Sequence, residues 1–319
     1  MSMSAPNSRM ITGLVAGIKA GWRSFIWMCR IVIPVSFVVA LLEWGGWLDR
    51  IDPLLNPLMG LLNLPPEAAL PIISGMLVNI YAVLGMIAVL PFTAAQMTLI
   101  ATFSLIAHNL IMEGIIQHRS GINVVKTTLI RVGGAVLTVL VVGRFFGDTS
   151  GSIAVTAGGI GQLPFAHMLR NWAVDTGILL LKILGIVVLI MVILEVSRSL
   201  GWMDSINRAF RPVMKVFGLA ERTTTMFVAG IVFGLLYGGA VIVEEAKRSG
   251  SQPGLTKADV EYLHISLGIN HSMIEDPALF AVQGLNAFWL WVPRLVLAIA
   301  AVQSYRAVNY LRRRRTRAV

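Results

Sequence analysis

SLIAHNLIME at residues 104–113 and SLGINHSMIE at residues 266–275 are two versions of one apolar segment that carries a histidine, an asparagine and a glutamate. A Ser-Leu pair opens each version and a glutamate closes it, whereas the histidine and the asparagine stand in opposite order. Ionisable residues are costly inside a membrane and usually face a helix-bundle interior, where they mark a solute or proton path. A duplicated hydrophobic chain with such a cluster in each half is typical of a membrane transporter.

The composition predicts a protein that crosses a membrane several times. Hydrophobic residues make up 56% of the 319 residues, charged residues make up 13%, and the mean hydropathy is +0.77. Soluble domains carry about 25% charged residues. Apolar runs such as 178–194 and 227–243 approach the roughly 20 residues that cross a bilayer. Residues 1–10 are polar and do not resemble a secretory signal, so we expect a multi-pass protein in contact with lipid in a bacterial inner membrane.

The charge pattern and the cysteine content exclude several other classes. The net charge is +10, but the basic residues cluster at span ends, most densely over 312–317, as the positive-inside rule predicts for cytoplasmic flanks. No basic soluble domain is left to bind nucleic acid. The single cysteine, Cys29, excludes an intrachain disulfide and a multi-cysteine metal site. Phosphate-binding glycine loops, nucleophile elbows and His-Glu-x-x-His motifs are absent, so neither an enzyme nor a bound cofactor is expected.

The duplication extends well beyond the two motif segments. WLDRI at 47–51 matches WMDSI at 202–206, and NPLM at 56–59 matches RPVM at 211–214. Each half therefore predicts the same order of elements: an apolar span, an amphipathic helix at the membrane surface, a glycine-bearing span, the motif segment and a last span. The expected ranges are 24–45, 47–64, 67–90, 94–117 and 122–145 in the first half, and 173–197, 202–219, 223–245, 258–281 and 284–306 in the second.

These elements predict an all-α polytopic membrane protein built from two tandem homologous repeats. The expected organisation is an N-terminal segment 1–21, a repeat 22–145, a linker 146–170, a repeat 171–307 and a basic tail 308–319.

The orientation of the two repeats can be argued from charge. The amphipathic segment of the first repeat has a net charge of −1, and that of the second has +2, which favours opposite sides of the membrane and hence inverted repeats. Inversion requires an odd number of crossings per repeat, so the motif segment is expected to be broken or re-entrant. Both termini and the loop at 118–119 would then lie inside the cell. Parallel repeats with four full crossings each are the alternative.

The motif segments supply the candidate binding residues. His271 and Glu275 are four residues apart, as are Asn109 and Glu113, so each pair shares one helix face. Imidazole with carboxylate suits Zn, Fe, Mn or Ni, and His271, Glu275 and Glu113 are the predicted metal ligands. The set also suits a sugar or base, a proton relay, or hydrogen bonds that only join helices. The full predicted substrate-binding set is His108, Asn109, Glu113, Asn270, His271, Glu275, Asp276, Tyr237 and Glu244.

Two further features accompany the motif segments. Tyr237 and the glycines after it lead to Glu244 and Glu245, which predict either a vestibule that concentrates cations or a solvated carboxylate pair at the membrane surface. Arg131 follows Glu113 by 18 positions and Arg294 follows Glu275 by 19. An arginine inside a span usually has a carboxylate partner, so both arginines are expected in structural ion pairs with one of the two glutamates.

The stretch YGGAVIVEEAKR at 237–248, followed by GINHSMIED at 268–276, resembles the nucleoside recognition or Gate domain family. That family includes the bacterial spore maturation A and B membrane proteins. Similar domains occur in the membrane part of the bacterial ferrous-iron transporter B and, more remotely, in concentrative nucleoside transporters. The resemblance covers most of the chain as two copies and implies that His271, Glu275 and Asp276 match the family's histidine and Glu-Asp pair. The first copy departs from it, with His108 and Asn109 in swapped order and Gly114 in place of the aspartate.

Together these features predict a transporter that moves a small polar solute or a divalent metal cation through a midplane site at the repeat interface. A metal is favoured over a nucleoside because the motif segments offer few aromatic surfaces for stacking. It would be the substrate and not a resident cofactor. A nucleoside transporter and a non-transport membrane assembly or signalling protein are the alternatives, and a homo-oligomer or a membrane partner protein is compatible with each.

Overall fold

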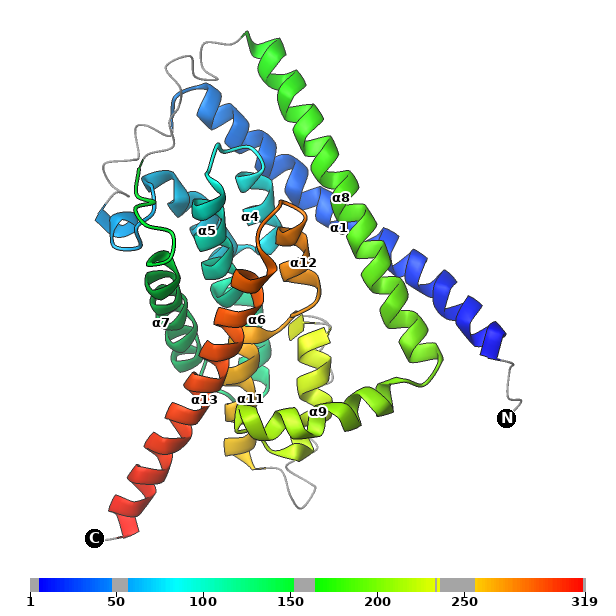
Figure 1. Cartoon of the computed structure of the whole chain (residues 1–319), viewed down its shortest axis with the longest axis vertical. Coiled ribbons are helices and arrows are strands. Elements are labelled where there is room, and N and C mark those ends of the chain that lie inside the picture. The colour runs from blue at the N-terminus through cyan, green and yellow to red at the C-terminus, as the bar shows by residue number, and fades with distance from the viewer. Residues whose placement is uncertain (1–5, 48–56, 152–163, 233, 236–255, 318–319) are drawn as a thin grey trace.

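The computed structural model describes residues 6–47, 57–151, 164–232, 234–235 and 256–317, and within these ranges it contains helices and no strand (Figure 1). Several helices are long and apolar enough to cross a bilayer. These candidate spans are Asn7–Trp44, Ala94–Arg119, Val124–Gly143, Phe165–Ser199 and Ala287–Leu311. The prediction of an all-α, multi-pass membrane protein is therefore confirmed.

The two longest apolar helices, α1 (Pro6–Trp44) and α8 (Phe165–Ser199), cross in an antiparallel pair at one side of the molecule (Figure 1). Gly13, Gly17 and Gly21 recur at intervals of four residues on α1, and a Cβ atom on any of them would lie under 3.0 Å from atoms of α8. Small residues at this spacing let two membrane helices approach closely. Near the opposite end of α1, Trp44 packs on Phe165 with ring centroids 5.5 Å apart, which fixes the antiparallel direction.

The first half continues with short helices. The 3-10 turn η1 (Pro66–Ala68) leads into α3 (Ala69–Leu77) and α4 (Ile80–Ile87), which are separated by two residues in non-helical conformations. Asn79 caps α4, because its side-chain oxygen accepts hydrogen bonds from two backbone N–H groups of the first turn. The expected single span over 67–90 is therefore wrong: the chain breaks at the residues before α4.

Helices α5 (Ala94–Ala107), α6 (Leu110–Arg119) and α7 (Val124–Gly143) complete the first half. The second half contains α9 (Met203–Phe217), the 3-10 turn η3 (Glu221–Thr223), α11 (Lys257–Asn270), α12 (Glu275–Ala281) and α13 (Ala287–Arg317). The motif segments are α5–α6 and α11–α12, each interrupted in the middle, which agrees with the expected broken helices. Helix α9 lies across the lower end of the molecule in Figure 1.

Local backbone features recur between the halves at regular offsets. Asn63 and Gly218, 155 residues apart, both have positive φ angles, of 56° and 71°. Thr93 and Thr256, 163 residues apart, both form capping boxes at the start of the helix that leads to the motif. The increase in offset places the extra residues of the second half between Gly230 and Thr256, a stretch that lies mostly outside the described residues.

Equivalent helices of the two halves also pack against each other in opposite directions. Helices α7 and α13 are antiparallel: Phe146 near the end of α7 packs on Trp289 near the start of α13, and Lys126 near the start of α7 binds Tyr305 farther along α13. Helices α1 and α8 show the same relation.

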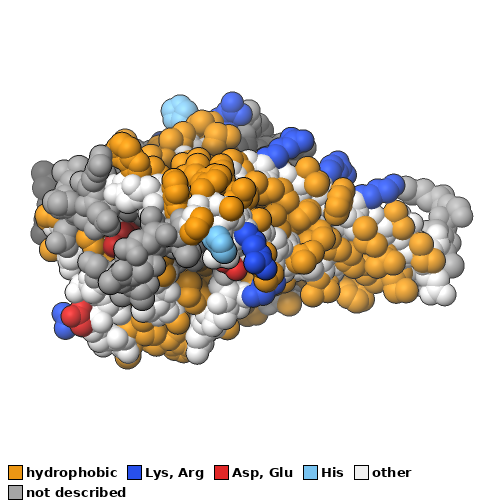
Figure 2. All heavy atoms as spheres, turned by 90° about the horizontal axis from the view of Figure 1, so that it is seen from above, with side chains coloured by type: hydrophobic (Ala, Val, Ile, Leu, Met, Phe, Trp, Pro, Cys, Tyr) orange, Lys and Arg blue, Asp and Glu red, His pale blue; other side chains and the backbone are white. Residues whose placement is uncertain are grey.

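The outer surface is apolar over most of its visible area (Figure 2). Large hydrophobic side chains remain exposed along the long helices, as on Leu181 of α8 and Leu129 of α7, which are 71% and 68% exposed. By contrast, several charged and polar side chains are buried between α5, α7, α11 and α12. Apolar residues outside and ionisable residues inside are the arrangement expected of helices surrounded by lipid.

Candidate functional site

The two motif histidines stand at the ends of equivalent helices. His108 is the C-cap of α5 and His271 is the C-cap of α11, and both have extended backbone conformations that stop the helix. The next residues, Asn109 and Ser272, have φ angles of 52° and 48°, in the left-handed region that non-glycine residues seldom adopt. Each motif segment therefore breaks immediately after its histidine and points the imidazole into the centre of the bundle.

Two glycines hold these breaks in place. The N–H of Asn109 donates to the carbonyl of Gly75 at 2.8 Å, and the N–H of Ser272 donates to the carbonyl of Gly230 at 3.0 Å. A Cβ atom at Gly75 would lie 2.7 Å from the side chain of Val83, and one at Gly230 would lie 2.6 Å from that of Leu267. Glycine thus allows a second backbone to approach the break and to satisfy the amide that the helix leaves free.

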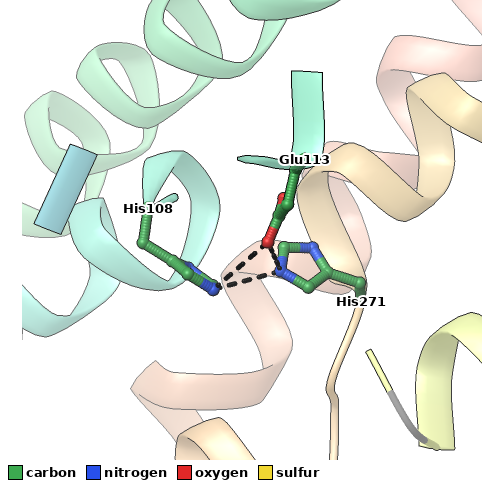
Figure 3. Close-up of side chains that lie close together, drawn as sticks. All are labelled: His108, Glu113 and His271. Atoms are coloured by element: carbon green, nitrogen blue, oxygen red, sulfur yellow. Dashed lines mark hydrogen bonds and ion pairs between the residues drawn. The ribbon is translucent and has the colours of Figure 1, made fainter. Parts of the chain in front are cut away.

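The imidazoles face each other across the two halves (Figure 3). Their Nε2 atoms are 3.1 Å apart. Each Nδ1 lies 2.8 Å from a carbonyl one turn earlier in its own helix, that of Ser104 for His108 and that of Leu267 for His271. Because a carbonyl only accepts hydrogen bonds, both Nδ1 atoms carry the proton, and a neutral ring then presents the Nε2 lone pair to the centre.

Glu113 completes the cluster. Its Oε1 lies 3.0 Å from Nε2 of His271 and 3.7 Å from Nε2 of His108, and its Oε2 accepts a hydrogen bond from Nη1 of Arg131 at 2.7 Å. The three cluster residues are at most 5% exposed, and Arg131 is 2% exposed. The prediction that Arg131 pairs with a motif glutamate is confirmed, and the arginine leaves one carboxylate oxygen of Glu113 directed at the histidines.

The cluster has the dimensions and the surroundings of a metal site. Ligand atoms about 2.0–2.1 Å from a tetrahedral metal ion lie ~3.3 Å from one another. The distances among the two Nε2 atoms and Oε1 are 3.1, 3.0 and 3.7 Å. Metal-bound histidines usually donate their other N–H to a carbonyl or carboxylate, and ligating carboxylates are themselves hydrogen-bonded. His108, His271 and Glu113 all meet these conditions.

The register of the repeat differs by one residue from the sequence expectation. The Ser-Leu pairs align Glu113 with Glu275, but the helix breaks align His108 with His271, at an offset of 163 residues, and the same offset relates Glu113 to Asp276. Glu275 is therefore not the counterpart of Glu113. The interval to the following arginine carried this signal, because it is 18 residues from Glu113 to Arg131 and 18 residues from Asp276 to Arg294.

The remaining predicted residues divide into groups. Glu275 was expected as a metal ligand, but its Oε1 accepts a hydrogen bond from the hydroxyl of Tyr81 at 2.9 Å, and it lies outside the three-residue cluster. Asn109 and Asp276 line the same cavity as the cluster, whereas Asn270 is fully buried but is not among the residues that line it. Tyr237, Glu244 and Glu245 lie outside the described residues.

A cavity of about 50 Å³ surrounds the cluster. Because a water molecule occupies at least about 10–15 Å³ on this scale, the cavity holds a few waters or a partly hydrated ion. Its wall includes Trp27, Asn79 and Tyr81, which come from α1 and from the break before α4. Trp27 and Tyr81 also pack edge to face with ring centroids 5.4 Å apart. Sequence reasoning did not assign a role to Trp27, since a tryptophan in an apolar helix carries no motif.

A larger groove of about 430 Å³ lies between α1 and α8. Trp27 and Glu275 line both this groove and the central cavity, so these two side chains separate the two spaces. Arg23 of α1 and the ion pair between Glu195 and Arg198 of α8 line the groove as well. The groove therefore leads from the buried cluster toward the end of α8 that adjoins α9.

Comparison with known proteins places the chain among membrane proteins of one family. Residues 25–148 and 180–261 match the Gate family, which is described as "Nucleoside recognition", so the chain belongs to this family. It is also similar to "Uncharacterized membrane protein YvoD" of Bacillus subtilis strain 168, with 26% identity over 288 residues that cover 89% of this chain and 91% of the relative. No solved structure matches the chain.

Proposed function

We propose that this protein transports a divalent transition-metal cation across the cytoplasmic membrane through the His108–Glu113–His271 cluster. The observation that carries the proposal is the convergence of two imidazole Nε2 atoms and one carboxylate oxygen within 3.7 Å of one another. With both Nδ1 atoms protonated, neutral rings direct only lone pairs at each other and at the carboxylate. Three electron-pair donors this close repel one another unless a cation lies between them, and imidazole with carboxylate suits Zn, Fe, Mn, Co or Ni.

The size of the cavity favours a metal ion over a nucleoside. Pockets for small organic ligands measure about 300–1,000 Å³, and the central cavity measures about 50 Å³. Trp27 and Tyr81 are the aromatic residues in its wall, and they pack edge to face on each other. The structure in this conformation thus offers no slot between aromatic rings for a base, although the family description refers to nucleosides.

The antiparallel packing of equivalent helices supports an inverted arrangement of the two halves. Helices α1 and α8 are antiparallel, as are α7 and α13, and the ends of α5 and α11 meet at the two histidines. In transporters built from inverted repeats, the substrate site lies at the repeat interface near the midplane, and rocking of one repeat against the other opens it to either side. The cluster has ligands from both halves, so such a movement would separate them and release the cation.

The distribution of charge supports an orientation for the chain. Helix α9 and the C-terminal end of α13 lie at the same end of the molecule (Figure 1), and Arg306 of α13 donates to the carbonyl of Gly218 just after α9. The exposed residues Arg208, Arg211 and Lys215 of α9 add positive charge there. The positive-inside rule assigns this end to the cytoplasm. The groove between α1 and α8 would then connect the cluster to the cytoplasmic side.

Thermal unfolding of the purified protein in detergent tests the proposal. A ligand that binds only the folded state stabilises it by about 2.7 kcal/mol at 100 times its Kd. We expect one or more of Mn²⁺, Fe²⁺, Co²⁺, Ni²⁺ and Zn²⁺ to raise the Tm by a few degrees, and a nucleoside panel to leave it unchanged.

The variant His271→Gln should lose the metal-dependent shift, whereas His264→Gln should keep it. His264 is also fully buried on α11 but lies outside the cluster, so this control removes the general effect of replacing a buried histidine. A shift with nucleosides alone, or a metal shift that survives His271→Gln, would refute the proposed site.

A further inference from the structure

Two buried arginines, 163 residues apart, bind the breaks of the two motif helices in the same way. Nε of Arg131 donates to the carbonyl of Ile106 at 2.9 Å, and Nε of Arg294 donates to that of Ile269 at 3.2 Å. Nη2 of each arginine donates to the carbonyl of its own histidine at 2.7 Å. The carbonyls that the broken helices leave free are thus capped by equivalent guanidinium groups.

The third nitrogen of each guanidinium group behaves differently in the two halves. Nη1 of Arg131 binds Glu113, whereas the buried Nη1 of Arg294 has no hydrogen-bond partner. At the position equivalent to Glu113 stands Asp276, whose side chain is one methylene shorter. Oδ2 of Asp276 is buried, makes no hydrogen bond, and lies 3.4 Å from Nε2 of His108. A buried charged atom without a partner is costly, so these two atoms call for an explanation.

Each carboxylate approaches the histidine of the other half. Glu113 lies 3.0 Å from His271, and Asp276 lies 3.4 Å from His108. The two pairs are related by the same offset of 163 residues, and the 3.1 Å contact between the imidazoles lies between them. Asp276 is 4% exposed and lines the central cavity.

We infer that Asp276 is a fourth ligand of the cation and that Arg294 is its positioning residue. This inference rests on the proposed metal function and deepens it. The complete site has two nitrogen and two oxygen ligands, one of each from either half. The unpaired Oδ2 of Asp276 receives a partner when the cation binds, and Arg294 orients the histidine carbonyl next to it. Glu275, the neighbouring carboxylate, is not a ligand, because Tyr81 binds its Oε1.

Titration calorimetry of the full-length protein with Co²⁺ and Zn²⁺ tests this assignment, with Asp276→Asn compared with Glu275→Gln. Both substitutions remove one buried carboxylate charge and keep the size of the side chain. We expect Asp276→Asn to weaken metal binding at least 10-fold and Glu275→Gln to change it less than about 3-fold, since changes around a metal site typically cost 10- to 100-fold in affinity. Asp276→Glu, which copies the first half, should retain binding.

The visible absorption of bound Co²⁺ provides a second readout that a loss of folding does not imitate. Four-coordinate Co²⁺ absorbs much more strongly than six-coordinate Co²⁺. We expect the bands to weaken and shift in Asp276→Asn and to persist in Glu275→Gln. Arg294→Lys should retain more of the wild-type spectrum than Arg294→Gln. Equal affinity and an unchanged spectrum in Asp276→Asn, while the wild type binds metal, would overturn the role of Asp276 alone. Failure of the wild type to bind either metal would overturn the proposed function together with it.

Discussion

His108 and His271 occupy equivalent positions in the two halves, and their Nε2 atoms meet at 3.1 Å in the middle of the molecule. Each ring is held by a carbonyl of its own helix, so neither can turn its Nε2 away without losing a buried hydrogen bond. The contact between the rings therefore depends on how the two halves are placed relative to each other. Any rotation of one half against the other changes the spacing of the ligands, which links metal binding to conformational change.

The buried pair of Arg131 and Glu113 should be essential for stability as well as for binding. Replacing one member of a buried ion pair leaves an uncompensated charge and costs about 3–5 kcal/mol. We expect Arg131→Met to lower the free energy of unfolding by roughly this amount, because the Glu113 carboxylate loses its 2.7 Å partner. Thermal or denaturant unfolding in detergent measures the loss. Arg144→Met, at an exposed arginine just after α7, should have little effect. A cost of under about 1 kcal/mol for Arg131→Met would show that the pair is unimportant.

The close approach of α1 and α8 should depend on small residues. We expect Gly17→Leu to separate the two helices, because even a Cβ atom there collides with the backbone of Val192. Overpacking of this kind typically costs about 1–3 kcal/mol. Gly185→Leu on α8 is the matched control, since a Cβ atom at Gly185 meets nothing within 4 Å. The Tm of the two variants in the same detergent gives the comparison, and an equal loss in both would contradict a specific role for the α1–α8 contact.

Trp27 should restrict passage between the central cavity and the groove. Its indole lines both spaces, so Trp27→Ala joins them. We expect faster metal flux into proteoliposomes, with metal affinity at the cluster nearly unchanged. Trp22→Ala, which removes an exposed indole five residues earlier on α1, should leave the flux as in the wild type. Unchanged flux in Trp27→Ala would mean that the cation does not pass through this groove.

The inverted arrangement makes a definite prediction about labelling. Cys29 is the chain's only cysteine, so Cys29→Ala provides a background for single cysteines. Ser150 and Ser205 are both exposed, the first shortly after α7 and the second on α9. We expect a membrane-impermeant maleimide to label Ser205→Cys from the cytoplasmic side and Ser150→Cys from the opposite side. Labelling of both from one side would contradict inversion.

The sequence predicted the class of fold because its signals are local. Apolar length identified the long helices, and the recurrence of tryptophan, proline and glycine positions identified the duplication. The break at His108 and Asn109 followed from the need to place polar groups at membrane depth. The break before α4 was not predicted, although Asn79 just ahead of an apolar run is a capping signal.

The site was predicted in part, and the error has a physical origin. Similarity of side chains aligned Glu113 with Glu275, but equivalence is set by the backbone, through the helix breaks and the arginines that cap them. A shift of one residue moves a helical side chain by about 100° around the axis, which directs Glu275 to Tyr81 and Asp276 to His108. Contacts between residues so far apart in the sequence depend on tertiary packing, which no local pattern reports.

Metal uptake into proteoliposomes tests the central claim most directly. Vesicles that contain the protein and an internal metal-sensitive dye would be exposed to Zn²⁺, Mn²⁺, Co²⁺ or Fe²⁺, beside vesicles with the double variant His108→Gln and His271→Gln. The account predicts saturable uptake of at least one metal by the wild type and a loss of uptake of 100-fold or so in the folded variant, because both nitrogen ligands are removed. Equal uptake by the wild type and the variant, or no metal uptake by a protein that transports nucleosides, would contradict it.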